Sequence, residues 1–141
     1  MAAQFSIVFD GLAAADGEPV SPALPRILQE LAKRGIRAKF FVDPSIEQDE
    51  PFALTMIENG GHKHAIGSAP AGDAYASTET GPADWHAAMQ VAVGRAMRTG
   101  ERTILAFAPA ALERGDAAGL FAETLDLIAG LVRAGSAEVV N

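Results

Sequence analysis

The 141-residue sequence contains no cysteine, which excludes disulfides, thiolate metal ligands and thiol nucleophiles together. Basic residues are few, since 11 Lys and Arg stand against 18 Asp and Glu and the formal net charge is −7. Because binding to phosphates needs clustered Lys and Arg, neither nucleic acid nor a membrane surface is an expected partner. No apolar run is long enough to span a bilayer. The first residues, Met1 to Gln4, lack the basic segment of a signal peptide, so the expected location is cytoplasmic.

The chain does contain apolar segments of two kinds, which alternate: some are typical of strands, and others have apolar residues at helical spacing. The length and a hydrophobic content of 49% predict a single domain over residues 1–141. Strands are predicted at 5–9, 36–42, 62–68, 103–108 and 137–140. Helices are predicted at 21–34, about 51–58, 84–98 and from Asp116 to the Ala134-Gly135 pair, and loops at 12–19, 45–50 and 69–83. This order predicts an α/β fold with a parallel sheet of about five strands and flanking helices.

Asp10 and Gly11 follow directly after the first predicted strand, Phe5 to Phe9. In parallel α/β folds, ligands bind outside the carboxyl ends of the strands. Asp10 is therefore predicted to lie at the functional edge of the sheet.

Four motifs lie along the chain in order: Phe9-Asp10-Gly11, Gly35 to Val42, Gly60 to Ser68, and Asp84-Trp85 before the strand at 103–108. They resemble the polysaccharide deacetylase family, or NodB-homology domain. Its members carry Phe-Asp-Asp-Gly, Gly-x-x-Ala-Thr-Phe-Phe-Val, Gly-His-Glu-Ile-Gly-Asn-His, and Asp-Trp before Gly-x-Ile-Leu-Leu. The resemblance covers most of the chain. It implies an incomplete or distorted (β/α) barrel and, for the family, metal-dependent hydrolysis of N-acetyl groups on sugars.

The sequence departs from the family pattern at the residues that bind the metal. The resemblance makes Asp10 the catalytic base, but Gly11 stands where the family has the Asp that binds the metal. If Ile66-Gly67 is aligned with the family's Ile-Gly, Ala69 and Asp73 stand at the two histidine ligands. The zinc or cobalt ion that activates water in such enzymes is therefore not expected here. The implied function is a deacetylase-like domain that has lost hydrolysis and acts as a binding or interaction module, with a carbohydrate as the expected ligand.

Three alternatives remain open at this point. His62 and His64 form a His-x-His pair, which on a strand places both imidazoles on one face. With Asp10 or Asp73 they would form a rearranged zinc or cobalt site, and the chain would then be an active carbohydrate or amide deacetylase. Trp85 is either a sugar platform or part of the core. Finally, the chain could be an unrelated flavodoxin-like domain that shares only its βα patterning with the deacetylases.

The strand count also bears on assembly. The family's barrel has seven strands, and this chain supplies about five. Unpaired sheet edges and an uncovered apolar inner face are features that natural proteins avoid. The sequence therefore predicts a homodimer that buries at least ~1,000 Å² in total.

Overall fold

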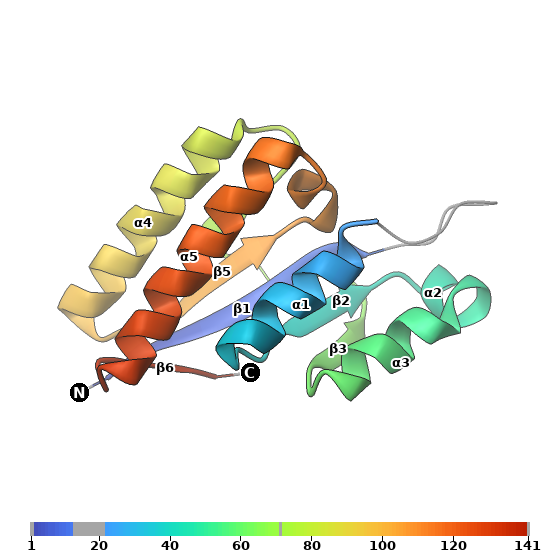
Figure 1. Ribbon diagram of the computed structural model, residues 1–141, viewed down its shortest axis with the longest axis horizontal. Coiled ribbons are helices and arrows are strands. Elements are labelled where there is room, and N and C mark those ends of the chain that lie inside the picture. Colours follow the sequence, from blue (N-terminus) through green and yellow to red (C-terminus); the bar gives the residue numbers. More distant parts are fainter. Residues whose placement is uncertain (1, 13–21, 71, 141) are drawn as a thin grey trace.

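The computed structural model describes residues 2–12, 22–70 and 72–140, and the loop predicted at 12–19 lies outside them except for Leu12. Strands and helices alternate along these residues (Figure 1). Their order is β1 (Ala3–Leu12), α1 (Leu24–Arg34), β2 (Lys39–Val42), α2 (Ser45–Asp49), α3 (Pro51–Asn59), β3 (Lys63–Ile66), β4 (Ala74–Ala76), α4 (Pro82–Thr99), β5 (Thr103–Phe107), the 3₁₀ helix η1 (Pro109–Leu112), α5 (Gly115–Arg133) and β6 (Ala137–Val139). Within this part of the chain, no helix has both the length and the apolar character needed to cross a membrane.

All strand pairs in the sheet are parallel, and the order is β3-β2-β1-β5-β4. The long central strand β1 also pairs with β6 through Ala3 to Phe5, and with β2 through Val8 to Leu12. β3 and β4 do not pair with each other in the described residues, so the sheet stays open. The predicted α/β sheet and its incomplete barrel are confirmed. A flavodoxin-like sheet would have the order 2-1-3-4-5, and that alternative is therefore wrong.

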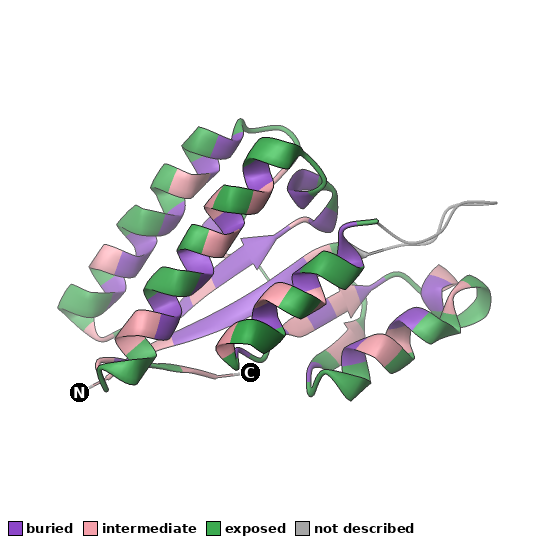
Figure 2. Cartoon of the chain, viewed as in Figure 1, coloured by how far each residue is buried: buried purple, intermediate pink, exposed green. Residues whose placement is uncertain are grey.

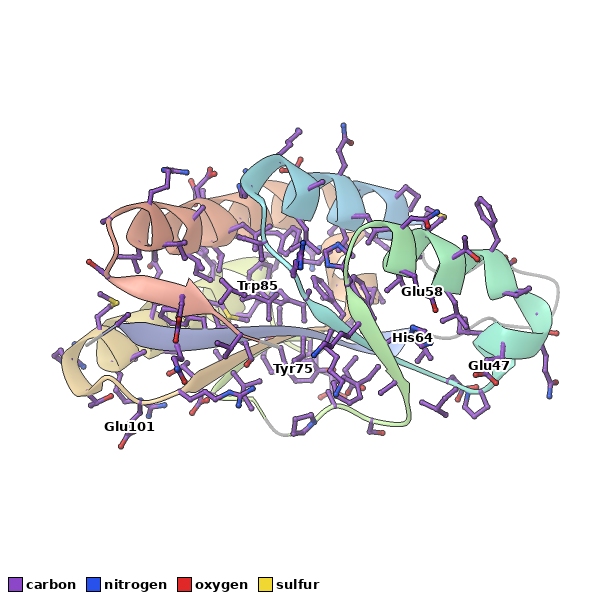
Figure 3. All side chains as sticks on the ribbon, turned by 90° about the horizontal axis from the view of Figure 1, so that it is seen from below. Glu47, Glu58, His64, Tyr75, Trp85 and Glu101 are labelled. Carbon is purple, nitrogen blue, oxygen red and sulfur yellow. The ribbon has the colours of Figure 1, made fainter. Side chains whose placement is uncertain are left out.

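The helices pack on one face of the sheet (Figure 3). Phe5, Ile7 and Phe9 of β1 point to this face and are fully buried, as the purple strand in Figure 2 indicates. The Phe9 ring stacks on Phe40 of β2 with 4.7 Å between centroids, and on Phe107 of β5 with 5.6 Å. Buried parallel strands are rich in aromatic and β-branched residues, which is why the sequence alone predicts a strand at residues 5–9.

The opposite face, which we call the inner face, carries the alternate residues of the strands. It comprises Ser6, Val8 and Asp10 of β1, Lys39 and Phe41 of β2, Tyr75 of β4, and Ile104 and Ala106 of β5. The chain crosses this face between β3 and β4, at opposite edges of the sheet (Figure 3). We call the crossing, residues 67–70 with 72 and 73, the strap. Beneath it Val8 and Ala106 are buried.

Two predicted loops contain regular structure instead. The acidic segment 45–50 forms α2, where the Asp43 carboxylate accepts a hydrogen bond from the Ser45 N–H at 2.9 Å. The segment 69–83 contains β4, which pairs with the carboxyl half of β5. The helix expected at Asp84 begins at Pro82, a residue that is favoured in the first turn because it has no N–H to leave unpaired.

Candidate functional site

Asp10 lies near the carboxyl end of β1, as predicted, and its carboxylate holds the strap. Its Oδ1 accepts a hydrogen bond from the Ala69 N–H at 3.0 Å. The backbone of the next residue, Gly11, has φ +81°, in the left-handed region that favours glycine. This edge of the sheet thus carries a half-buried carboxylate, followed by a backbone conformation that residues with a side chain rarely adopt.

Two hollows flank Asp10. One, of about 110 Å³, is lined by Asp10, Ala69, Pro70, Gly72, Tyr75 and Ala106. The other, of about 270 Å³, is lined by Asp10, Gly11, Asp43, Pro44, Gly67 and Ser68. The carboxyl edge of the sheet thus offers two carboxylates and two side-chain hydroxyls to a ligand.

Tyr75 is the exposed aromatic residue of this edge. Its side chain is on the inner face, and the residue is 46% exposed (Figure 3). Burial of part of the phenol, and then the charges of Asp10 and Glu79, raise the pKa of Tyr75. The phenol is therefore protonated at neutral pH, and its O–H can donate a hydrogen bond to a ligand.

The residues at the family's metal-ligand positions do not fit a divalent ion. Gly11 and Ala69 have no donor side chain. Asp73 has both oxygens engaged: Oδ2 accepts from the Ile104 N–H at 2.8 Å, and Oδ1 pairs with Arg95 Nη2 at 3.0 Å. Across residues 2–12, 22–70 and 72–140, no three His, Asp or Glu side chains are grouped so that they could hold a metal ion.

His62 and His64 are in different surroundings, and neither forms a hydrogen bond or ion pair with Asp10 or Asp73. His62 precedes β3 and is 6% exposed. Its Nδ1 accepts the Ala38 N–H at 3.0 Å, and its ring packs edge-on against Phe40. Burial, and then the Arg37 charge, lower the pKa of His62. His64 lies nearer the surface, with Nδ1 3.6 Å from Glu58 Oε1. The structure does not assemble the residues of the rearranged metal site.

Trp85 belongs to the core. It is 2% exposed and packs edge-on against Phe107, with 6.2 Å between ring centroids. Of the two alternatives left open for Trp85, the structure therefore supports the core position and not the sugar platform. The exposed aromatic at the site is Tyr75, which sequence analysis missed because β4 was interpreted as part of a loop.

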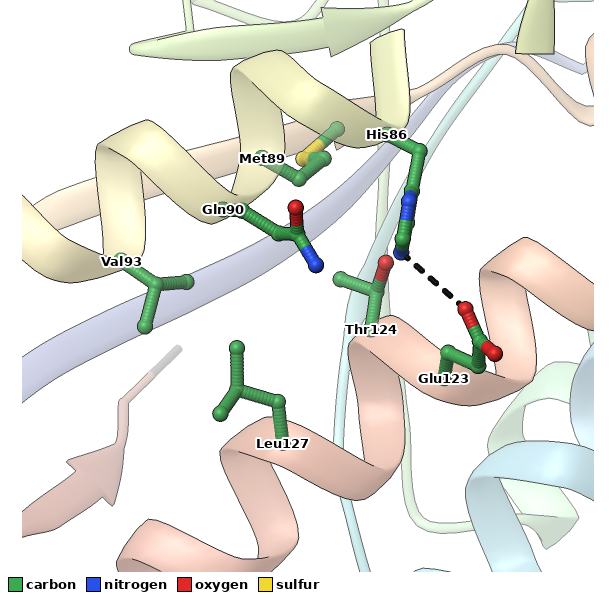
Figure 4. Close-up of a pocket in the computed structure, with 7 residues that line it drawn as sticks. All are labelled: His86, Met89, Gln90, Val93, Glu123, Thr124 and Leu127. Carbon is green, nitrogen blue, oxygen red and sulfur yellow. Dashed lines mark ion pairs between the residues drawn. The ribbon is translucent and has the colours of Figure 1, made fainter. Parts of the chain in front are cut away.

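A further hollow of about 290 Å³ lies between α4 and α5 (Figure 4). At one end His86 Nε2 is 3.4 Å from Glu123 Oε2, and the Thr124 hydroxyl donates to the Leu120 carbonyl. His86 and Glu123 therefore pair with each other, and Thr124 bonds to its own helix. None of its lining residues lines either hollow beside Asp10.

Comparison with known proteins supports the fold. No protein-family model matches the sequence, and no curated protein matches it significantly. In structure, the chain is similar to a family 4 carbohydrate esterase from Bacillus anthracis, with a TM-score of 0.54 and 13% sequence identity over 98% of this chain and 80% of that one. At such low identity the similarity concerns the fold alone. The chain therefore has an open, parallel α/β fold similar to that of this esterase.

Proposed function

We propose that this chain is a deacetylase-like domain that binds a carbohydrate at the carboxyl edge of the sheet without hydrolysing it. The donor set at the family's ligand positions carries this proposal, because Gly11, Ala69 and Asp73 offer no free ligand to a metal. A bound ion lowers the pKa of water from 15.7 to about 7. A base at Asp10 acting alone would face water that is not activated, and its carboxylate already accepts a hydrogen bond from the strap.

The chemistry of the edge supports a carbohydrate as the ligand. Sugar hydroxyls donate hydrogen bonds to carboxylates such as Asp10 and Asp43, and accept them from hydroxyls such as those of Ser68 and Tyr75. The exposed Tyr75 ring supplies an apolar surface beside a polar tip, which suits the mixed character of a sugar. Pockets for drug-sized ligands are about 300–1,000 Å³, whereas these hollows are about 110 and 270 Å³. A single sugar unit is therefore the expected occupant of the site. The similarity of fold to a carbohydrate esterase adds an analogy.

The test combines a binding assay with an activity assay on one substrate, an N-acetylated chito-oligosaccharide. We expect no release of acetate, with or without added zinc or cobalt. We expect saturable binding in an NMR titration, with shifts at Asp10 and Tyr75. Tyr75→Ala should weaken binding about fivefold to tenfold, the typical contribution of an aromatic contact.

Phe52→Ala provides a matched control, because Phe52 is an exposed aromatic on α3 that does not line either hollow. It should leave binding unchanged. Metal-dependent release of acetate that Asp10→Asn abolishes would instead favour an active deacetylase with a rearranged site. If the wild-type chain shows no saturable binding, the carbohydrate proposal is wrong.

A further inference from the structure

We propose a second site on the inner face, beyond the strap from Asp10, that binds a small organic anion consisting of a carboxylate on a planar apolar body. This inference does not rest on the proposed function. A cavity of about 210 Å³ opens here, and Pro70 of the strap forms part of its wall. Val8, Phe41 and Ile104 supply further apolar lining, and two basic side chains, Lys39 and Arg102, also line it.

Arg102 is held in place by a buried serine. Its Nε and Nη2 both donate to Ser6 Oγ, at 3.2 and 2.9 Å. Ser6 is buried, and its hydroxyl donates in turn to the Val140 carbonyl at 3.0 Å. A guanidinium carries five N–H donors, so the Nη1 donors are left for a ligand. Ser6 is thus a positioning residue. It fixes the Nε and Nη2 side of the guanidinium, a planar group whose donors suit carboxylates.

Lys39 brings a second positive charge to the same cavity. Its Nζ is 5.1 Å from the centroid of the Phe41 ring, which is half-buried. Neither Lys39 nor Arg102 forms an ion pair with any residue that the structure describes. Two uncompensated cations at one apolar cavity, in a chain with a net charge of −7, favour an anionic ligand.

None of the residues that line the cavity is acidic. Gln4 of β1 is paired with Glu138 of β6, and the Glu138 carboxylate accepts the Gln4 amide N–H at 2.7 Å. Glu138 does not line the cavity. The positive charges therefore face the cavity without a competing carboxylate in its wall.

The apolar lining and the size of the cavity define the rest of the ligand. A small inorganic ion would leave Val8, Phe41 and Ile104 without apolar contacts, and a neutral apolar molecule would leave both cations unpaired. A volume of about 210 Å³ is below the ~300 Å³ at which pockets accept drug-sized ligands. The ligand that fits both features has about one ring and one carboxylate.

Benzoate is the probe for this site, and benzamide is its neutral counterpart of the same shape. We expect benzoate to titrate the NMR signals of Ser6, Lys39 and Ile104 saturably, with a Kd of about 1 mM for so small a ligand. Benzamide should bind at least about tenfold more weakly, because its neutral carbonyl cannot form an ion pair with Lys39 or Arg102. This comparison uses the wild-type chain only, so it does not depend on how any variant folds.

Variants then locate the site. Arg102→Gln and Lys39→Gln should each weaken benzoate binding about tenfold or more, and Ser6→Ala should weaken it while leaving the guanidinium in the chain. Arg98→Gln is the matched control, since it removes the same charge from an exposed position on α4 that does not line the cavity. Benzoate should still bind saturably to the wild-type chain in the presence of excess chito-oligosaccharide, which separates this site from the carbohydrate site.

Three results would overturn the proposal. The first is the absence of saturable benzoate binding to the wild-type chain. The second is an equal effect of Arg98→Gln and Arg102→Gln, because binding would then follow the overall charge rather than the cavity. The third is binding of inorganic phosphate as tight as that of benzoate, which would remove the role of the apolar lining.

Discussion

Asp73 anchors one end of the strap, and replacing it tests whether this crossing is held as described. Its main-chain N–H donates to the Ile104 carbonyl at 2.8 Å, and its carboxylate accepts the Ile104 N–H at 2.8 Å. The other carboxylate oxygen pairs with Arg95 of α4 at 3.0 Å. Asp73 therefore joins the strap to β5 and to α4 at once. Asp73→Ala removes both side-chain contacts but leaves the main-chain bond.

The expected magnitude follows from these two contacts. A hydrogen bond to a charged group contributes ~1.5–3 kcal/mol when buried. The Asp73 side chain is 34% exposed, so about 1–2 kcal/mol is expected of the bond to Ile104. The exposed ion pair with Arg95 adds ~0.2–1 kcal/mol. Asp73→Ala should therefore lower the free energy of unfolding by about 1.2–3 kcal/mol, or the Tm by about 4–10 °C in a domain of this size.

Asp73→Asn separates the two contacts, because its amide oxygen can still accept the Ile104 N–H while the charge is lost. It should cost only about 0.5 kcal/mol, close to the cost of Arg95→Gln. Urea unfolding followed by circular dichroism measures all three variants. The reasoning is refuted if Asp73→Ala is as stable as the wild-type chain, or if Asp73→Asn is as destabilised as Asp73→Ala.

Three further predictions concern pH, packing and assembly. The pKa of His62 is lowered in the folded chain, so on acidification the imidazole is protonated in the unfolded chain first. The contribution of neutral His62 to the free energy of unfolding is therefore complete above pH ~6.5 and is lost as the pH falls through the lower folded value. Stability curves of the wild-type chain and His62→Asn should therefore converge below pH ~6.5, and parallel curves would contradict this. A Cβ on Gly60 would lie 2.8 Å from His62 Cδ2, so Gly60→Ala should cost ~1–3 kcal/mol in urea unfolding. Gly119→Ala on α5, where a Cβ meets nothing within 4 Å, should instead stabilise by ~0.5–1 kcal/mol, and equal effects of the two would refute the packing argument. The homodimer stays a prediction: light scattering should give a mass twice 14.6 kDa, and a monomer at micromolar concentration would count against it.

The parts of the fold that were predicted from sequence are those whose pattern is set locally. In β1, four of the five residues at 5–9 are β-branched or aromatic, and α1 has one apolar stripe that ends at Gly35, where φ is +64°. β4 could not be found in this way. Its sequence, Ala-Tyr-Ala, is too short to show a period, and it is a strand because β5 pairs with it.

The candidate site was predictable only in part, for a related reason. Topology alone located Asp10, because the carboxyl ends of parallel strands meet at one edge. Its partner, the Ala69 N–H, has no sequence signature, since every residue other than proline has a main-chain donor. The His-x-His motif suggested a metal, but His62 Nδ1 accepts a main-chain N–H from a segment 24 residues earlier in the chain. Such contacts depend on tertiary structure and leave no local pattern.

The strap covers the inner face, and it is held there by two acids, Asp10 and Asp73, that a metal site would need. A segment that crosses a sheet has few ladder partners, so its main-chain N–H groups need acceptors elsewhere. Asp10 accepts at the carboxyl edge, and Asp73 fixes the far end on Ile104. A metal bound to either acid would compete with these bonds. Donor side chains at positions 11 and 69 would therefore not be enough to create a metal site. An Asp at position 11 would also have to adopt φ +81°, which is unfavourable by ~1 kcal/mol for residues with a side chain.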